Sequence, residues 1–383
     1  MLHGSNHPAR LRAAVTAWVL CTGALVVILA CGRAPRAAEA SFVIDETPLQ
    51  LADTGLYADI ATQTIASGVL AFEPQYPLWS DGSSKRRWMR LPAGTAIDAT
   101  NPDRFVFPIG TRLWKEFAFE RRVETRMLTR ATDGQWRFAT YVWNADQSGA
   151  TLAPEKGVRG ACESAPGVPF DIPARADCVA CHTAGPDVVL GFNALQLSED
   201  RDPLAPHARP LPDGALTLSE LVRRGIVVHL PEALVETPPR IAAASERERA
   251  VLGYLNTNCG ICHSIRNPIP GLDLDLSYSL AATEAETPAA ISTTVDRPSR
   301  FRWPTDTTPL RIARAEPDLS VLTRRMASRQ PLSQMPPLGT HLRDDVALEL
   351  VTAWMHSDLD PECCGGTLTS ILPSTHNQKT RKP

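Results

Sequence analysis

The sequence predicts a multidomain protein in which a β-rich N-terminal domain precedes a mainly α C-terminal region. Alternation typical of strands dominates residues 41–160, and helical spacing of apolar residues returns after residue 243. The length of 383 residues also exceeds what a single core normally organises. The formal net charge of −3 gives no basic excess, so nucleic acid is not expected as a partner.

Residues 1–40 have the pattern of an export signal. Arg10 and Arg12 precede the apolar run 13–30, and small residues follow it. The run ends in "ILACG", which resembles a bacterial lipoprotein signal in which Cys31 would be acylated. Cleavage after Ala40 and an uncleaved membrane anchor are the alternatives. We therefore expect an exported, periplasm-facing protein held at the membrane by a lipid or an anchor.

The β-rich domain, residues 41–160, contains one clear hairpin pattern. The segment "RRVETRMLTRATDGQWRFATYVWN" alternates with a period of two on both sides of "TDG". Five tryptophans supply bulk for a core, with a tryptophan-lined sugar site as the alternative. These tryptophans are Trp79, Trp88, Trp114, Trp136 and Trp143.

Residues 161–242 form an irregular, proline-rich region. Its one helical signal is "TLSELVRRG", where Thr217 and Glu220 are spaced as a capping box and Gly225 is placed to end the helix.

Residues 243–360 return to helices. Ser245 and Glu248 form a second capping-box pattern, and this helix runs into "NTNCGICH". Two further helices are expected in "PDLSVLTRRMAS" and "RDDVALELVTAWMHS". Residues 361–383 are expected to form a flexible tail.

Two copies of the pattern CxxCH carry the chemistry. One consists of Cys178, Cys181 and His182, and the other of Cys259, Cys262 and His263. This spacing places both thiols on one side of a turn, where they can add to the two vinyl groups of a haem while the histidine reaches its iron. The motifs therefore predict two covalently bound haem c groups.

Three other uses of these cysteines fit the pattern less well. A shared zinc site would leave two histidines unused, a thioredoxin-like pair needs a βαβ setting, and adjacent CxxC cysteines make strained disulfides.

The second motif lies in a segment that resembles a class I cytochrome c domain, residues 245–360. In that family a helix leads into CxxCH, a Met-Pro sequence supplies the sixth iron ligand, and a C-terminal helix packs across the first. In "QMPPLG" the resemblance makes Met335 that ligand, while Met326 is expected in the core. A carbonyl of Pro268 or Pro270 would accept from the His263 ring.

The first motif is less regular, because three prolines in "SAPGVPFDIPARAD" argue against a helix before Cys178. The sixth ligand of its haem is His207, His229, a methionine of the β domain (Met89 or Met127), or nothing. An open position would leave an iron able to bind small ligands.

The whole chain also resembles an uncharacterised bacterial family that joins a β-rich domain to a cytochrome c-like region. The segments that carry this resemblance are "GLYADIATQTIASGVLAFEPQYPLWSDGSSKRRWMRLP", "YVWN" and "VLGFNALQLS". Beyond the N-terminal segment and the two motifs, Cys162 is expected to pair with Cys363 or Cys364. The alternative is that the two adjacent cysteines bind copper or stay free.

The sequence thus predicts a dihaem c-type cytochrome that passes single electrons to a periplasmic or membrane redox partner. Two alternatives stay open: a dihaem peroxidase or oxidase whose first haem is catalytic, and a carbohydrate- or partner-binding protein with accessory haems.

Overall fold

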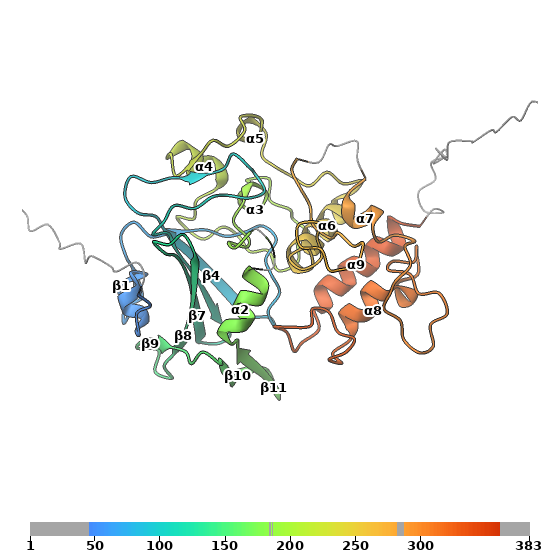
Figure 1. Cartoon of the computed structure of the whole chain (residues 1–383), viewed down its shortest axis with the longest axis horizontal. Coiled ribbons are helices and arrows are strands. Elements are labelled where there is room, and N and C mark those ends of the chain that lie inside the picture. The colour runs from blue at the N-terminus through green and yellow to red at the C-terminus, as the bar shows by residue number, and fades with distance from the viewer. Residues whose placement is uncertain (1–45, 184, 186, 282–286, 361–383) are drawn as a thin grey trace, which may run out of the picture. The chain divides into compact units, whose positions relative to one another are not determined.

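A computed structural model describes residues 46–183, 185, 187–281 and 287–360 (Figure 1). These residues belong to one compact unit that starts at Ile44. Strands dominate up to the first CxxCH motif, and most helices follow it. Up to that motif the elements are η1 (Leu51–Thr54), β1 (Tyr57–Asp59), β2 (Thr64–Ile65), β3 (Leu70–Ala71), β4 (Ser84–Arg90), β5 (Ile97–Asp98), β6 (Arg112–Ala118), β7 (Arg122–Arg130), β8 (Trp136–Trp143), β9 (Ala150–Leu152), β10 (Val158–Ala165), β11 (Val168–Ile172) and α2 (Arg175–His182).

After the motif, most elements are short, and two helices of 13 residues are the longest. They are α3 (Ala194–Leu197), α4 (Leu218–Arg223), β12 (Val227–Val228), α5 (Ala233–Glu236), α6 (Glu246–Asn258), α7 (Ala289–Ser292), η2 (Pro317–Leu319), α8 (Val321–Ala327) and α9 (Asp345–Ser357). β12 pairs in parallel with β5, so residues 161–242 are joined to the β-rich region through backbone hydrogen bonds.

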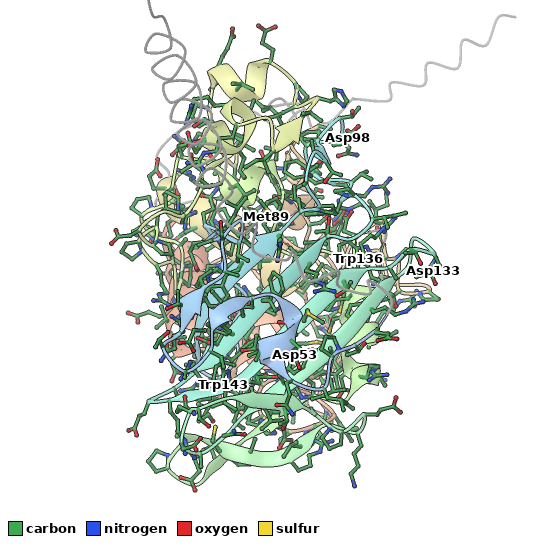
Figure 2. The ribbon with its side chains drawn as sticks, turned by 90° about the vertical axis from the view of Figure 1, so that its left-hand side faces the viewer. Asp53, Met89, Asp98, Asp133, Trp136 and Trp143 are labelled. Atoms are coloured by element: carbon green, nitrogen blue, oxygen red, sulfur yellow. The ribbon has the colours of Figure 1, made fainter. Side chains whose placement is uncertain are left out.

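The main sheet has six antiparallel strands in the order β3-β4-β6-β7-β8-β9. The expected hairpin is confirmed as β7 and β8, whose residues Arg126 and Thr140 lie opposite each other. Trp88, Trp114 and Trp143 pack in one buried cluster of the sheet, and Figure 2 labels Trp143. The β-rich N-terminal region and the core role of these tryptophans are therefore confirmed.

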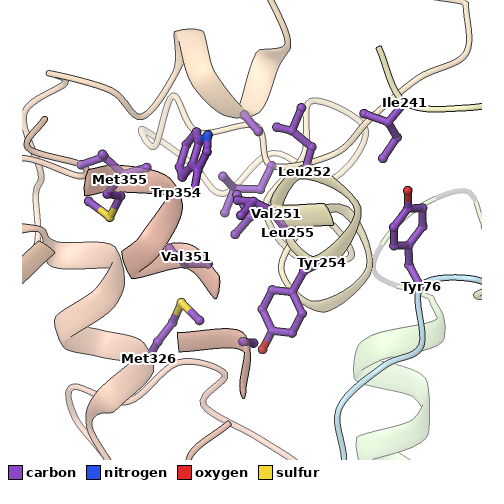
Figure 3. Packing of buried hydrophobic residues seen from close by; sticks show 14 of the residues in the cluster. Tyr76, Ile241, Val251, Leu252, Tyr254, Leu255, Met326, Val351, Trp354 and Met355 are labelled. Carbon is purple, nitrogen blue, oxygen red and sulfur yellow. The ribbon is translucent and has the colours of Figure 1, made fainter. Parts of the chain in front are cut away.

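The two long helices pack against each other and against the β-rich region. The Ser245 hydroxyl accepts from the Glu248 N–H at 3.0 Å, so the expected cap begins α6. Val251 and Leu255 of α6 share a buried cluster with Val351 and Trp354 of α9. Tyr76, from the segment between β3 and β4, lies on the opposite side of α6 from Trp354 (Figure 3).

The three helices expected after residue 243 form as α6, α8 and α9, but the region as a whole is less helical than expected. No helix lies between Cys259 and Pro288 or between Thr293 and Glu316 in the part of the chain that is described, so a mainly α region is not what the structure shows. Proline removes a backbone donor, and these loops hold several prolines. The capping box predicted for α4 is wrong. The Thr217 side chain makes no hydrogen bond to the first turn of the helix, and the Glu220 carboxylate binds Arg223 and Arg224.

Some expectations concern parts that lie outside the described residues. These are the signal segment 1–40 with Cys31, and the tail 361–383 with Cys363 and Cys364.

Within the ranges described above, no helix is both long and apolar enough to span a bilayer.

Candidate functional site

The first CxxCH motif is itself helical. It forms α2, which begins after Ala174, where the Asp177 carboxylate accepts from the Ala174 N–H at 2.9 Å. Cys178 and Cys181 are three residues apart on this helix, so both thiols share a face. Pro173 is the last proline before the motif, so the helix that begins at Arg175 contains none.

The main sheet supports this helix. Cys178 lines a small cavity together with Phe138 and Thr140 of β8. The ring of His182, at the end of α2, lies with its centroid 5.4 Å from that of Phe138. The sheet therefore places the cysteine and the histidine of the motif over the same strand.

The His182 ring is neutral and has one nitrogen that could bind a metal ion. Its Nδ1–H donates to the Val188 carbonyl at 2.7 Å, a bond that leaves Nε2 with a lone pair. Burial, reinforced by Lys115 and Arg126, lowers the pKa of His182 to about 4. The ring is therefore uncharged at neutral pH, as binding to iron requires.

The cysteines carry thiols rather than thiolates. Burial raises the pKa of Cys178, Cys181 and Cys262, and it raises the pKa of Cys259 to about 12. All four are free thiols in the structure. A thioredoxin-like pair needs a thiol with a lowered pKa, so these environments do not favour that use.

The second motif follows directly from α6. The N–H groups of Cys262 and His263 both donate to the Cys259 carbonyl, at 3.0 and 2.9 Å, which closes the turn. The Nδ1 atom of His263 is buried and has no hydrogen-bond partner within the described residues. The expected bond from Pro268 or Pro270 is therefore wrong, because both prolines lie in an exposed loop.

The structure brings the two motifs together. The Asp187 carboxylate, just after the first motif, pairs with Arg266, just after the second, at 3.1 Å. Burial raises the pKa of Cys181 most, and the neighbouring Cys262 adds to that rise, which is consistent with the meeting of the two segments. The CxxCH sequences, distant along the chain, thus face a common region.

Met335 lies in a loop that two arginines hold. Its N–H donates to the Arg325 carbonyl at 3.0 Å, and its own carbonyl accepts from Arg329 at 3.2 Å. The Arg325 side chain also lowers the pKa of His263, so both residues border the same arginine. Met326 is buried in the helical core, and that expectation is confirmed.

The candidates for the sixth ligand of the first haem have partners elsewhere. His207 Nε2 donates to Asp344 at 2.8 Å, and His229 Nδ1 donates to Asp98 at 3.0 Å. Met89 and Met127 belong to separate buried clusters of the β-rich region. None of these recorded contacts involves α2.

Cys162 lies in β10 opposite Phe170 of β11 and has a free, half-buried thiol. The cysteines with which it was expected to pair are not among the described residues.

Sequence reasoning missed Lys115, Arg126, Val188 and Arg329. Burial and neighbouring cations lower the pKa of Lys115 well below its usual value. The only sequence signal was that Lys115 and Arg126 each stand within a strand pattern, where a charged side chain facing inward is uncommon.

No group of three or more His, Cys, Asp or Glu side chains is arranged to hold a metal ion in the described ranges. A c-type haem takes one histidine per motif and needs no such group. No family model matches the chain, and neither a curated protein nor a solved structure does.

Proposed function

We propose that this protein is an exported dihaem c-type cytochrome that transfers single electrons. The observation that carries the proposal is the meeting of the two CxxCH motifs, seen in the Asp187–Arg266 pair at 3.1 Å. Electron transfer between two haems requires them to be close, and unrelated cysteine pairs have no reason to meet in this way.

Each motif has its own part in this function. The thiols of Cys178 and Cys181 would hold one haem and those of Cys259 and Cys262 the other, each pair through its vinyl groups. His182 and His263 would be the iron ligands of their motifs. When bound, haem supplies a one-electron iron couple whose potential rises if a methionine is the second axial ligand.

The residues fit these roles in three respects. The thiols are protonated, as addition across a vinyl group requires, since the S–H hydrogen goes to carbon. The His182 ring is oriented by the Val188 carbonyl, as ligating histidines usually are. The pKa of His263 is lowered, chiefly by burial, so its ring is neutral, as an iron ligand must be.

The C-terminal region is proposed to be a class I cytochrome c-like domain with Met335 as the distal ligand. The packing of α6 on α9 supports this assignment, as does the placement of Met335 beside Arg325, which His263 also borders. Acylation of Cys31, or an uncleaved anchor, would hold the protein at the membrane near its redox partner.

Paired cysteine substitutions test the proposal. The double variant Cys178→Ala/Cys181→Ala should keep one covalent haem, and Cys259→Ala/Cys262→Ala should keep the other, each with a single midpoint potential. The matched control Cys162→Ala should keep both haems and both potentials. Loss of haem in none of the variants would contradict the assignment.

A second function, a peroxidase or oxidase with a catalytic first haem, is favoured by one observation. The rings of His207 and His229 bond to Asp344 and Asp98, so each already has a partner other than the first motif, which supports an open sixth position there. A high-spin ferric spectrum that changes on adding cyanide would favour this second function, and a wholly low-spin spectrum would favour the carrier.

A further inference from the structure

A row of cations crosses the face of the main sheet on which α2 lies. Arg87, Lys115 and Arg126 lie directly opposite one another on β4, β6 and β7. Thr140 of β8 continues the row, and it lines the same small cavity as Cys178. The row therefore starts beneath the first CxxCH motif and runs away from its cysteines.

Such a row is unfavourable unless anions compensate for it. Side chains directly opposite on neighbouring strands have Cβ atoms about 5 Å apart, and like charges at that separation repel. Glu73 pairs with Arg87 at 2.8 Å, and Glu124 binds Arg126 through both of its oxygens. The two outer cations are thus neutralised.

Lys115, in the middle, is not neutralised. Within the described residues it has neither a carboxylate within salt-bridge distance nor a hydrogen bond, and its amine lies 5.0 Å from the centroid of the Phe117 ring. Lys85, on the same face, donates to the Ser83 carbonyl at 3.1 Å, and no described carboxylate lies within salt-bridge distance of its amine. The face therefore holds two amines without a carboxylate partner among the described residues. Burial and neighbouring cations lower the pKa of both amines, and a bound anion would favour their protonated forms.

The middle of the row is also partly exposed. The Arg126 side chain keeps 28% of its surface exposed and Lys115 is half-buried, whereas Arg87 keeps only 6%. Lys115 is two strands from β8, or about 10 Å along the sheet. A partly exposed amine at this distance from the cysteines, without a carboxylate partner among the described residues, is suited to receive an anionic group.

We propose that Lys115, flanked by Arg87 and Arg126, forms a binding site for a carboxylate or a similar oxyanion beside the first motif. Two sources share this chemistry. One is a propionate of the first haem, which rests on the proposed function, and the other is a free small anion that approaches the same site.

The test compares Lys115→Met with the control Lys156→Met, which removes a lysine from an exposed turn. Lys115→Arg keeps the charge and should behave like the wild type. Three quantities are measured on the full protein produced with haem attachment: the covalent haem count, the midpoint potentials, and the melting temperature as inorganic sulfate replaces chloride at constant ionic strength. Circular dichroism confirms that each variant is folded.

If a propionate is the ligand, Lys115→Met lowers one midpoint potential, because loss of a cation favours the ferric form, and the sulfate response stays as in the control. If a free anion is the ligand, the rise in melting temperature with sulfate shrinks in Lys115→Met and both potentials stay unchanged. Equal behaviour of Lys115→Met and Lys156→Met in both measurements overturns the site.

The haem count separates the two proposals. Protein without covalent haem refutes the proposed function, and the sulfate comparison on that same protein still decides whether Lys115 binds an anion.

Discussion

Replacing Arg329 by leucine should release the loop that carries Met335. The guanidinium donates to the carbonyls of Met326, Met335 and Leu342 at 2.8, 3.2 and 3.1 Å, and to the Thr340 hydroxyl at 3.1 Å. One side chain thus ties the end of α8 to the Met335 loop and to the segment that precedes α9.

The expected cost follows from two of these bonds. The bonds to Met335 and Leu342 join separate segments, and a hydrogen bond to a charged group contributes about 1.5–3 kcal/mol. Because the side chain is half-exposed, we take the lower value for each bond, which gives about 3 kcal/mol for Arg329→Leu. A free-energy change of this size shifts the equilibrium for release of the loop by about two orders of magnitude.

Urea unfolding and the optical spectrum measure this effect. Arg329→Leu should lower the urea midpoint and weaken the charge-transfer band from methionine to ferric iron. Arg324→Leu is the matched control, because Arg324 pairs with Asp306 and stacks on Trp303 without a recorded contact to the loop. An unchanged band and midpoint in Arg329→Leu would refute the tethering role.

Three other outcomes are expected. Gly253→Ala should destabilise the fold by about 1–3 kcal/mol in urea unfolding, because a Cβ there would lie 2.1 Å from the ring of Tyr76, whereas Gly149→Ala meets no such atom and should be near neutral. Burial, helped by nearby arginines, lowers the pKa of Lys85 to about 7. Above pH 7 the unfolded chain therefore binds more protons than the folded one, and the free energy of unfolding should rise from pH 7 to 9. Lys85→Met should flatten that rise, and an unchanged slope would contradict the assignment. Met335→Ala should abolish the charge-transfer band and lower one midpoint potential, and the ligand assignment fails if neither changes.

Local patterns predicted the local structure well. The alternation around "TDG" identified the hairpin β7–β8, and Ser245 with Glu248 identified the start of α6. These patterns reflect contacts between residues close in sequence, so the same contacts are present in the folded protein. The Thr217 box failed because exposed arginines one turn on compete for the same Glu220 carboxylate.

These patterns could not predict which residues distant in sequence lie close together in the fold. The pairing of Asp187 with Arg266 and the row through Lys115 depend on which strands and loops meet, and alternation along a strand does not tell which of its faces is covered. The sequence pointed to the first motif but not to the helix α2, since the preceding prolines mask a helix that begins only three residues before Cys178.

The central claim is that two haems are covalently attached to this chain, one at each CxxCH motif. Intact mass spectrometry of the mature protein, after extraction of non-covalent haem with acid and acetone, tests it most directly. We expect the polypeptide mass to be increased by two haems, and by one haem in Cys259→Ala/Cys262→Ala. A mass equal to that of the polypeptide alone would contradict the claim.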